Sequence, residues 1–486
     1  MTDCTTKSGG LMLAEVLALL AVAAGTSWAF PLLQAMQMTT ALTVAYLVAR
    51  SYYARCCHAC MGGRVVLLLA ALWLAAIAVP FVHHATLGSG ATFRMPTLYN
   101  DAARYYDWAL AHYDGSAIEP TVTFWGYPLM IVGLWRVLGV SIIWPVALNV
   151  MMTLLTIVLT GQLAARVVAT DQRRTATVAM AMIAVQAFFM SQGAQMLKES
   201  WVYLAITLIA YSLVPLSRSE KQETRSKRQE AGSKRQEARS KKQSRHYSLL
   251  IIHCSLFFLG CFVLAAVRAK YVNFIFIAIV MLAVAGRLRQ WRYYATLLML
   301  TAVCWWMGMA MTDNYTIVQQ VNNVTGQGGM DAMFPAQGAY HSLLGDYYHY
   351  PLWKKLLYLP ITCGVQWVIP FPWLPAGSHA SWFGMVPRLR LGWYVLSGVV
   401  VYFYIFVSWR RNLQWMAWAW FPMVCYVGIA YMTSGTVSRY ILAFEPWWMV
   451  LAAVTVLTCW RQRRFRIFMA AYLLLIVTLL AICHQL

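Results

Sequence analysis

The stretch Val65–Val82, VVLLLAALWLAAIAVPFV, carries no charge and is long enough to cross a bilayer as a helix, which takes roughly 17–25 apolar residues. Similar runs recur along the whole chain of 486 residues, of which 61% are hydrophobic and 11% charged. The runs lack the ten-residue alternation of a membrane β-barrel, and a helix satisfies its own backbone in lipid. The sequence therefore predicts an all-α polytopic membrane protein.

Clusters of Lys and Arg between the apolar runs are typical of cytoplasmic loops. Placing them inside gives about 13 transmembrane helices, with the N-terminus in the cytoplasm and the C-terminus outside. In this scheme Thr177–Phe189 crosses the membrane and Gly193–Glu199 is a short outer loop. Leu356–Trp373 contains three prolines, so we expect it to be re-entrant or interfacial rather than a plain span.

The expected domain organisation is two membrane halves joined by a basic linker. Residues 1–216 form the first half with an outer loop at about 84–122, and residues 247–486 form the second with an outer loop at 312–355. The linker, 217–246, repeats RSKRQEA-like units and holds 11 Lys or Arg against 4 Glu. Its copies have no apolar positions to bury, which favours a solvated cytoplasmic tether. The net charge of +22 is therefore explained by basic cytoplasmic loops and by attraction to anionic membrane lipids, and we do not expect nucleic acid as a partner.

The first outer loop contains Leu98–Ala109, LYNDAARYYDWA, which is rich in polar and aromatic residues. Other ionisable residues are expected on the same side of the membrane, where the positive-inside bias does not explain them. Among them we expect Asp101 to act as a general base on an attacking hydroxyl. Basic residues would bind a lipid-linked phosphate: Arg439, Arg268, Lys270 and Lys198. The substrate would contact Arg104, Tyr105, Asp107, Glu199 and Tyr127. Helix capping by Asp101 and interfacial anchoring by the basic residues are the alternative interpretations.

The order of these features resembles the GT-C class of polytopic glycosyltransferases. The resemblance rests on the acidic motif Asn100-Asp101 followed by Tyr105, on Gly126-Tyr127-Pro128, on Asn149 with Ala165-Arg166, and on Arg439-Tyr440 before Glu445-Pro446. It implies an enzyme that moves a hexosyl or pentosyl group, with inversion, from a polyprenyl-phosphate sugar to a glycan, lipid or protein acceptor. By the same resemblance, Asp101 is the base and Arg439 contacts the donor phosphate.

Three questions stay open at this point. Many members of the class carry paired acids, whereas Asn100 precedes Asp101 here, so no metal ligand is assigned and Mg²⁺ or Mn²⁺ at the acidic loop remains an alternative. A polysaccharide polymerase or ligase of the O-antigen or capsule type would also need outer arginines and a long outer loop. A transporter or flippase fits less well, because the ionisable groups lie at segment ends except for Glu15. The basic inner loops favour a bacterial inner membrane.

Overall fold

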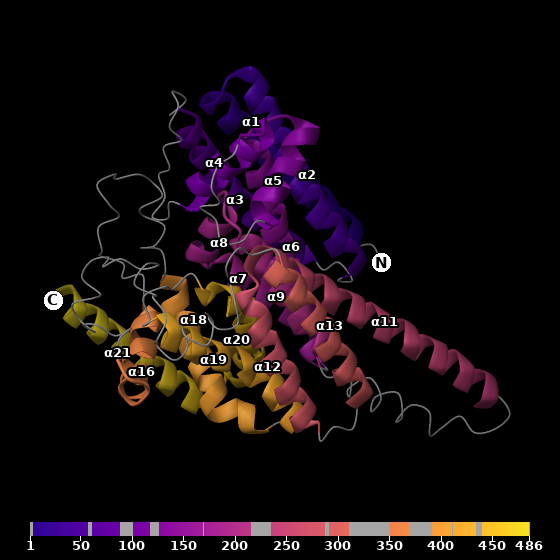
Figure 1. Ribbon diagram of the computed structural model, residues 1–486, viewed down its shortest axis with the longest axis vertical. Helices are drawn as coiled ribbons and strands as arrows, with labels where there is room; N and C mark the ends of the chain where they lie inside the picture. Colours follow the sequence, from indigo (N-terminus) through magenta and orange to yellow (C-terminus); the bar gives the residue numbers. More distant parts are fainter. Residues whose placement is uncertain are drawn as a thin grey trace.

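The computed structural model describes residues 3–56, 61–87, 101–116, 126–168, 170–214, 235–286, 291–310, 350–368, 391–410, 412–433 and 440–485. Within these ranges the protein is built from helices, without a strand (Figure 1). The first half contains α1 (Asp3–Ala29), α2 (Leu32–Cys56), α3 (Met61–Leu87), α4 (Asp101–Asp114), α5 (Gly126–Leu138), α6 (Ile143–Val167), α7 (Gln172–Ala184), α8 (Ala187–Gly193) and α9 (Glu199–Ser212).

The second half begins with α11 (Arg235–Arg268), which extends well beyond its neighbours (Figure 1). The remaining elements are α12 (Lys270–Ala285), α13 (Trp291–Ala310), α16 (Leu352–Val368), α18 (Leu391–Tyr402), η4 (Phe403–Val407), η5 (Ser408–Arg410), α19 (Leu413–Thr433), η7 (Leu442–Phe444), α20 (Glu445–Cys459) and α21 (Arg463–Gln485). Because α11 starts at Arg235, the last part of the basic linker is helical and continuous with the apolar segment that follows.

Among the described residues, 8 helices are long and apolar enough to cross a membrane, or up to 9 if the bent pair α7–α8 is one span. The protein is therefore an all-α, polytopic integral membrane protein. The core lies around α6 and α20, where 78% and 83% of the residues in the apolar stretch are buried. In α1 only 22% are buried, so this helix is peripheral. Much of the surface of α1 is apolar, as expected for a helix that faces lipid.

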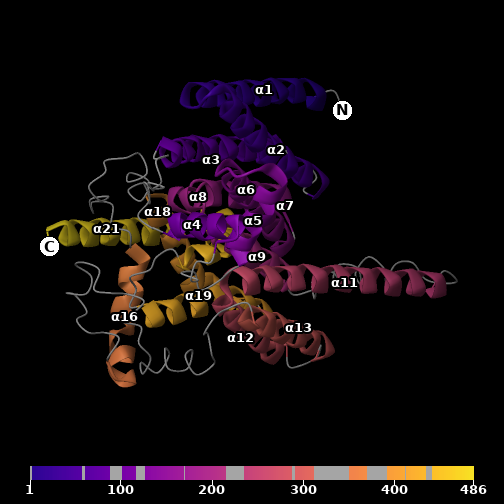
Figure 2. The ribbon, with the colours of Figure 1, turned by 45° about the horizontal axis from the view of Figure 1, so that its top comes forward.

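The two halves share this core instead of forming separate bodies. Helices α9 and α11, which flank the basic linker in sequence, pack along each other (Figure 2). Helix α20 packs against α6 and α7. Helix α5 has 13 residues, too few for a span, and ends at Leu138. The next residue, Gly139, has a φ of 82°, which suits the left-handed position after a helix. Helix α16, from the segment expected to be re-entrant or interfacial, runs across the direction of α21 in Figure 2.

Polar contacts define two ends of the bundle. At one end, the Tyr52 hydroxyl donates to Gln162 Oε1 over 3.2 Å and thereby joins the C-terminal turns of α2 and α6. The residues Arg50, Arg64 and Arg166 belong to this end, which we call the arginine end. The helices α6 and α9 begin and α11 finishes at the opposite end, which we call the site end.

Candidate functional site

The central feature of the site end is a buried, bent segment. Helices α7 and α8 meet at 75°, and every residue from Gln186 to Ser200 is buried. The sequence predicts that Thr177–Phe189 crosses the membrane and that Gly193–Glu199 is a short outer loop. In the structure the first stretch is bent between α7 and α8, and the second is buried in the protein. Non-helical backbone at membrane depth is tolerated where protein surrounds it or where it lines a cavity. The other helices therefore enclose this segment.

Asn149 on α6 holds the turn that leads out of α8. Its Nδ2 donates to the carbonyl oxygens of Gln195 and Leu197, each at 2.7 Å, and to the Tyr127 hydroxyl at 2.9 Å. Its Oδ1 accepts a hydrogen bond of 3.0 Å from Trp201 Nε1. Asn149 is fully buried, so one side chain satisfies polar groups from α5, the turn and α9 that would be costly to leave unpaired.

The turn delivers Glu199 to a buried ion pair with Arg268, the last residue of α11. Arg268 Nη1 lies 3.4 Å from Glu199 Oε1, and the two side chains are only 8% and 2% exposed. The guanidinium also lies over the Tyr440 ring, 4.1 Å from its centroid. The Tyr271 hydroxyl donates to the Tyr440 carbonyl over 2.7 Å. The start of α9, the end of α11, the start of α12 and the segment at Tyr440 thus meet at this ion pair, whose two charges neutralise each other.

Lys198, the residue before Glu199, links the turn to α4. Its Nζ lies 5.5 Å from the centroid of the Tyr105 ring, and that ring packs edge-on against Tyr127 at 5.2 Å. Tyr105 is four residues after Asp101, which begins α4, so the two side chains lie on the same helical face. A carboxylate and an ammonium group are therefore brought to the same region from α4 and from the buried turn.

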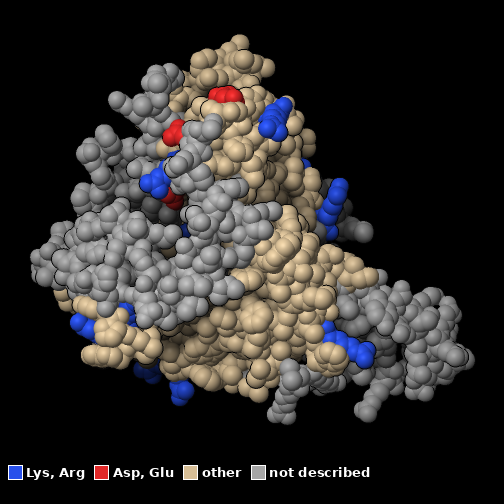
Figure 3. Space-filling view, in the orientation of Figure 1, with Lys and Arg blue, Asp and Glu red and all other residues tan. Residues whose placement is uncertain are grey.

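Arg104 and Asp107 lie on the exposed side of α4, away from Tyr105. Partial desolvation raises the pKa of the Asp107 carboxyl above its ordinary value. Figure 3 shows acidic and basic side chains close together on the upper part of the molecule, where α4 and α8 lie in Figure 1. The structure thus brings together Lys198, Glu199, Arg268, Tyr105 and Tyr127. Asp101 lies on the same face of α4 as Tyr105, whereas Arg104 and Asp107 lie on the exposed side of that helix.

Two predicted phosphate contacts cannot be placed. Arg439 lies outside the described residues, although its neighbour Tyr440 is anchored by Arg268 and Tyr271. Lys270 begins α12, and its side chain lies outside the described set. Within the described residues no group of three or more His, Cys, Asp and Glu side chains could hold a metal ion. Much of the predicted acidic loop, 88–100 and 117–125, is not among them.

Several buried oxygen atoms of this segment and of the first turn of α9 have no hydrogen-bond partner among the described residues. They are Gln192 Oε1, Gln195 Oε1, Glu199 Oε2, Ser200 Oγ and the Tyr203 hydroxyl. Buried polar atoms without partners are rare in folded proteins and often mark bound water or functional sites. Sequence reasoning missed Gln192 and Tyr203 because neutral polar residues are common in apolar runs. The spacing of Gln192, Gln195 and Glu199 by three and four residues is a helical pattern of polar residues, and it could have predicted that they act together.

Comparison with known proteins gives no relative from which a role could be transferred: no family model and no curated protein matches this chain.

Proposed function

We propose that this protein is an integral membrane glycosyltransferase that moves a sugar from a polyprenyl-phosphate carrier to an acceptor at the site end. The observation that carries the proposal is the convergence of Lys198, on the buried turn, with the helix that begins at Asp101. An enzyme of this kind needs a base for the acceptor hydroxyl and a cation for the leaving phosphate, at the depth of the lipid headgroups.

In this proposal Asp101 takes the proton of the acceptor hydroxyl and Lys198 stabilises the charge that develops on the phosphate. Arg268 is already paired with Glu199, so we assign it to holding the Tyr440 region in place. Arg439, the residue before Tyr440, and Lys270 stay proposed donor contacts from the sequence. Tyr105 and Tyr127 would form the wall beside Lys198.

The proposed orientation puts the arginine end in the cytoplasm, because positive loops stay inside. Arg50, Arg64 and Arg166 at one end, and the paired Arg268 at the other, support this assignment. The proposed topology keeps about 13 crossings, a cytoplasmic N-terminus and a bacterial inner membrane. The site would then face the outer leaflet.

The test is sugar transfer by the purified full-length protein in proteoliposomes, with a panel of radiolabelled polyprenyl-phosphate sugars. Asp101→Asn removes the base, and we expect transfer to fall about 10²–10⁴-fold, the usual contribution of general base catalysis. Asp114→Asn is the matched control at the exposed end of the same helix, and its transfer rate should stay within about threefold of that of the unmodified protein. Adding Mg²⁺, Mn²⁺ or a chelator to the same assay decides whether a divalent cation takes part.

The two variants separate the proposal from its closest alternative. Equal loss in Asp101→Asn and Asp114→Asn would contradict the base assignment. Transfer that survives Asp101→Asn and fails in Arg439→Ala would favour a polysaccharide polymerase or ligase, and lipid-diphosphate oligosaccharides would then replace the donor panel.

A further inference from the structure

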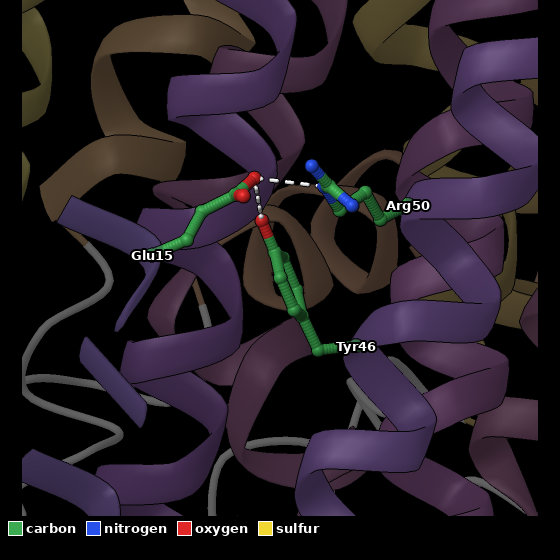
Figure 4. A network of polar contacts seen from close by, with 3 residues as sticks. All are labelled: Glu15, Tyr46 and Arg50. Atoms are coloured by element: carbon green, nitrogen blue, oxygen red, sulfur yellow. Dashed lines mark hydrogen bonds and ion pairs between the residues drawn. The ribbon is translucent and has the colours of Figure 1, made fainter. Parts of the chain in front are cut away.

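A second buried polar network lies at the arginine end, far from the proposed reaction. Glu15, inside the apolar helix α1, is 7% exposed. Its Oε1 accepts a hydrogen bond of 2.8 Å from the Tyr46 hydroxyl and one of 2.9 Å from Arg50 Nε, both from α2 (Figure 4). An ionisable residue within a membrane segment is costly, so its pairing indicates a role.

The network uses only one of the hydrogen-bonding nitrogens of the Arg50 guanidinium. Only Nε contacts Glu15, and the two terminal nitrogens form no hydrogen bond with the described residues. The Arg50 side chain is 35% exposed, so these nitrogens can reach the surface. Glu15, itself bonded to Tyr46, occupies one donor of the guanidinium and leaves the terminal donors for a bidentate phosphate contact.

Arg64, at the start of α3, lies beside this network and has no partner of its own. It forms no hydrogen bond or ion pair with the described residues, and its Nε is buried. Tyr46, Arg50 and Tyr53 follow the i, i+4, i+7 pattern of one α2 face, and the Tyr53 hydroxyl packs directly against Gly63. Arg64 follows Gly63 in the chain, so the contact between Gly63 and Tyr53 places Arg64 next to this face of α2.

Two guanidinium groups with one carboxylate leave an excess positive charge at a partly buried place. Such a charge is unfavourable at the membrane boundary unless an anion compensates it. Arg50 lies five residues before Arg55, where the apolar part of α2 ends, so it is at about 7.5 Å along the helix from the boundary. An arginine side chain of this length can extend its guanidinium over that distance toward the headgroups, and anionic lipids favour the cytoplasmic leaflet.

We propose that Arg50 and Arg64 together bind the phosphate of an anionic phospholipid at the arginine end, between α1, α2 and α3. Glu15 and Tyr46 orient Arg50, and the acyl chains lie along the apolar surface of α1. The site is independent of the sugar-transfer proposal and needs no catalytic activity to be measured.

The experiment titrates the purified full-length protein, in neutral detergent, with dioleoyl phosphatidylglycerol, dioleoyl phosphatidylcholine or inorganic phosphate. Thermal unfolding and native mass spectrometry report stabilisation and bound lipid. We expect saturable stabilisation by phosphatidylglycerol alone. The key variant is Arg64→Gln, which leaves Glu15 paired with Arg50, and we expect its apparent affinity to fall about tenfold or more.

Arg55→Gln is the matched control, because Arg55 is an exposed arginine at the same end and the change in charge is identical. It should bind the lipid within about twofold of the unmodified protein. The double variant Glu15→Gln with Arg50→Gln removes the orienting pair without leaving a buried charge, and should also bind weakly. Equal weakening by Arg55→Gln, or equal stabilisation by phosphatidylcholine or inorganic phosphate, would overturn the proposal.

Discussion

The buried ion pair of Glu199 and Arg268 would be costly to break by removing one partner. Each side chain is nearly inaccessible, so removal of either would leave the other as an uncompensated buried charge, at about 3–5 kcal/mol. Such pairs add little net stability compared with apolar residues, and their usual justification is geometric. Here the pair joins the first residue of α9 to the last residue of α11, at the place where the proposed substrate would bind.

Asn149 offers the sharpest test of how the buried turn is held. Asn149→Leu keeps the volume but leaves two carbonyl oxygens, the Tyr127 hydroxyl and the Trp201 indole N–H without their partner. We expect the protein to lose about 3 kcal/mol of unfolding free energy. Amide hydrogen exchange, followed by mass spectrometry over residues 194–201, should become faster in the variant.

Thr160→Val is the control on the same helix, because among the described residues the Thr160 hydroxyl bonds only the carbonyl of Thr156, one turn earlier. It should leave exchange over 194–201 unchanged. Unchanged exchange in Asn149→Leu would mean that the turn is held by packing alone.

The sequence identifies Lys198, Glu199 and Arg268 because charged residues at the ends of apolar runs are conspicuous. It does not reveal that Glu199 and Arg268 pair, since they lie 69 positions apart and only the packing of α9 on α11 brings them together. Asn149 belongs to the motifs that resemble the GT-C class. Its hydrogen bonds to the backbone carbonyls of Gln195 and Leu197 could not be predicted, because every residue has a carbonyl and only the fold brings these two to Asn149.

At the scale of elements, the contact between α5 and α11 depends on a glycine. A Cβ at Gly126 would meet the backbone carbonyl and Cβ of Ala266 at less than van der Waals distance, so Gly126→Ala must push the two helices apart. We expect a loss of about 1–3 kcal/mol in unfolding free energy, as for other overpacked sites. Thermal unfolding in detergent measures it.

Gly133→Ala is the control within α5, because nothing lies within 4 Å of its Cβ position. A helical glycine in open space should tolerate alanine and gain up to about 1 kcal/mol. Similar stability of the two variants would contradict the close approach of α5 to α11.

The break between α7 and α8 shows what an apolar pattern cannot encode. Thr177–Phe189 contains neither proline nor glycine, so a continuous helix is the natural prediction. In the structure the Val185 carbonyl lies against Gly392 of α18, and Gln186 Nε2 reaches the carbonyl of Met182 at 3.4 Å. The bend is thus associated with a neighbour about 200 residues away, and tertiary packing overrides local propensity.

At the scale of the whole molecule, the helical membrane class follows from composition and run length alone. Topology does not, since the described residues contain 8 candidate spans, or up to 9, against about 13 expected. Short helices such as α9, with 14 residues, account for part of the difference. Their apolar sequences predict membrane crossings, but the helices themselves are too short to count as candidate spans.

The proposed topology makes an expectation that reporter fusions can check. With the N-terminus inside and an odd number of crossings, a C-terminal alkaline phosphatase fusion should be active and a C-terminal green fluorescent protein fusion dark. Fusions within the basic linker at residue 230 should give the opposite pattern, which provides the internal control. Fluorescence from both positions would require an even number of crossings and would move the C-terminus to the cytoplasm.

The buried segment Gln186–Ser200 has a consequence for biogenesis. A ribosome makes it before most of its surroundings exist, and its polar backbone could not remain in lipid without partners. Its enclosure includes α20, which follows more than 240 residues later, with Gln186 reaching Met449 at 4.0 Å. The site region must therefore wait, at the membrane surface or in the translocation machinery, until synthesis is nearly complete. We expect a chain that stops before α20 to leave this segment open to proteolysis, because part of its enclosure would be missing.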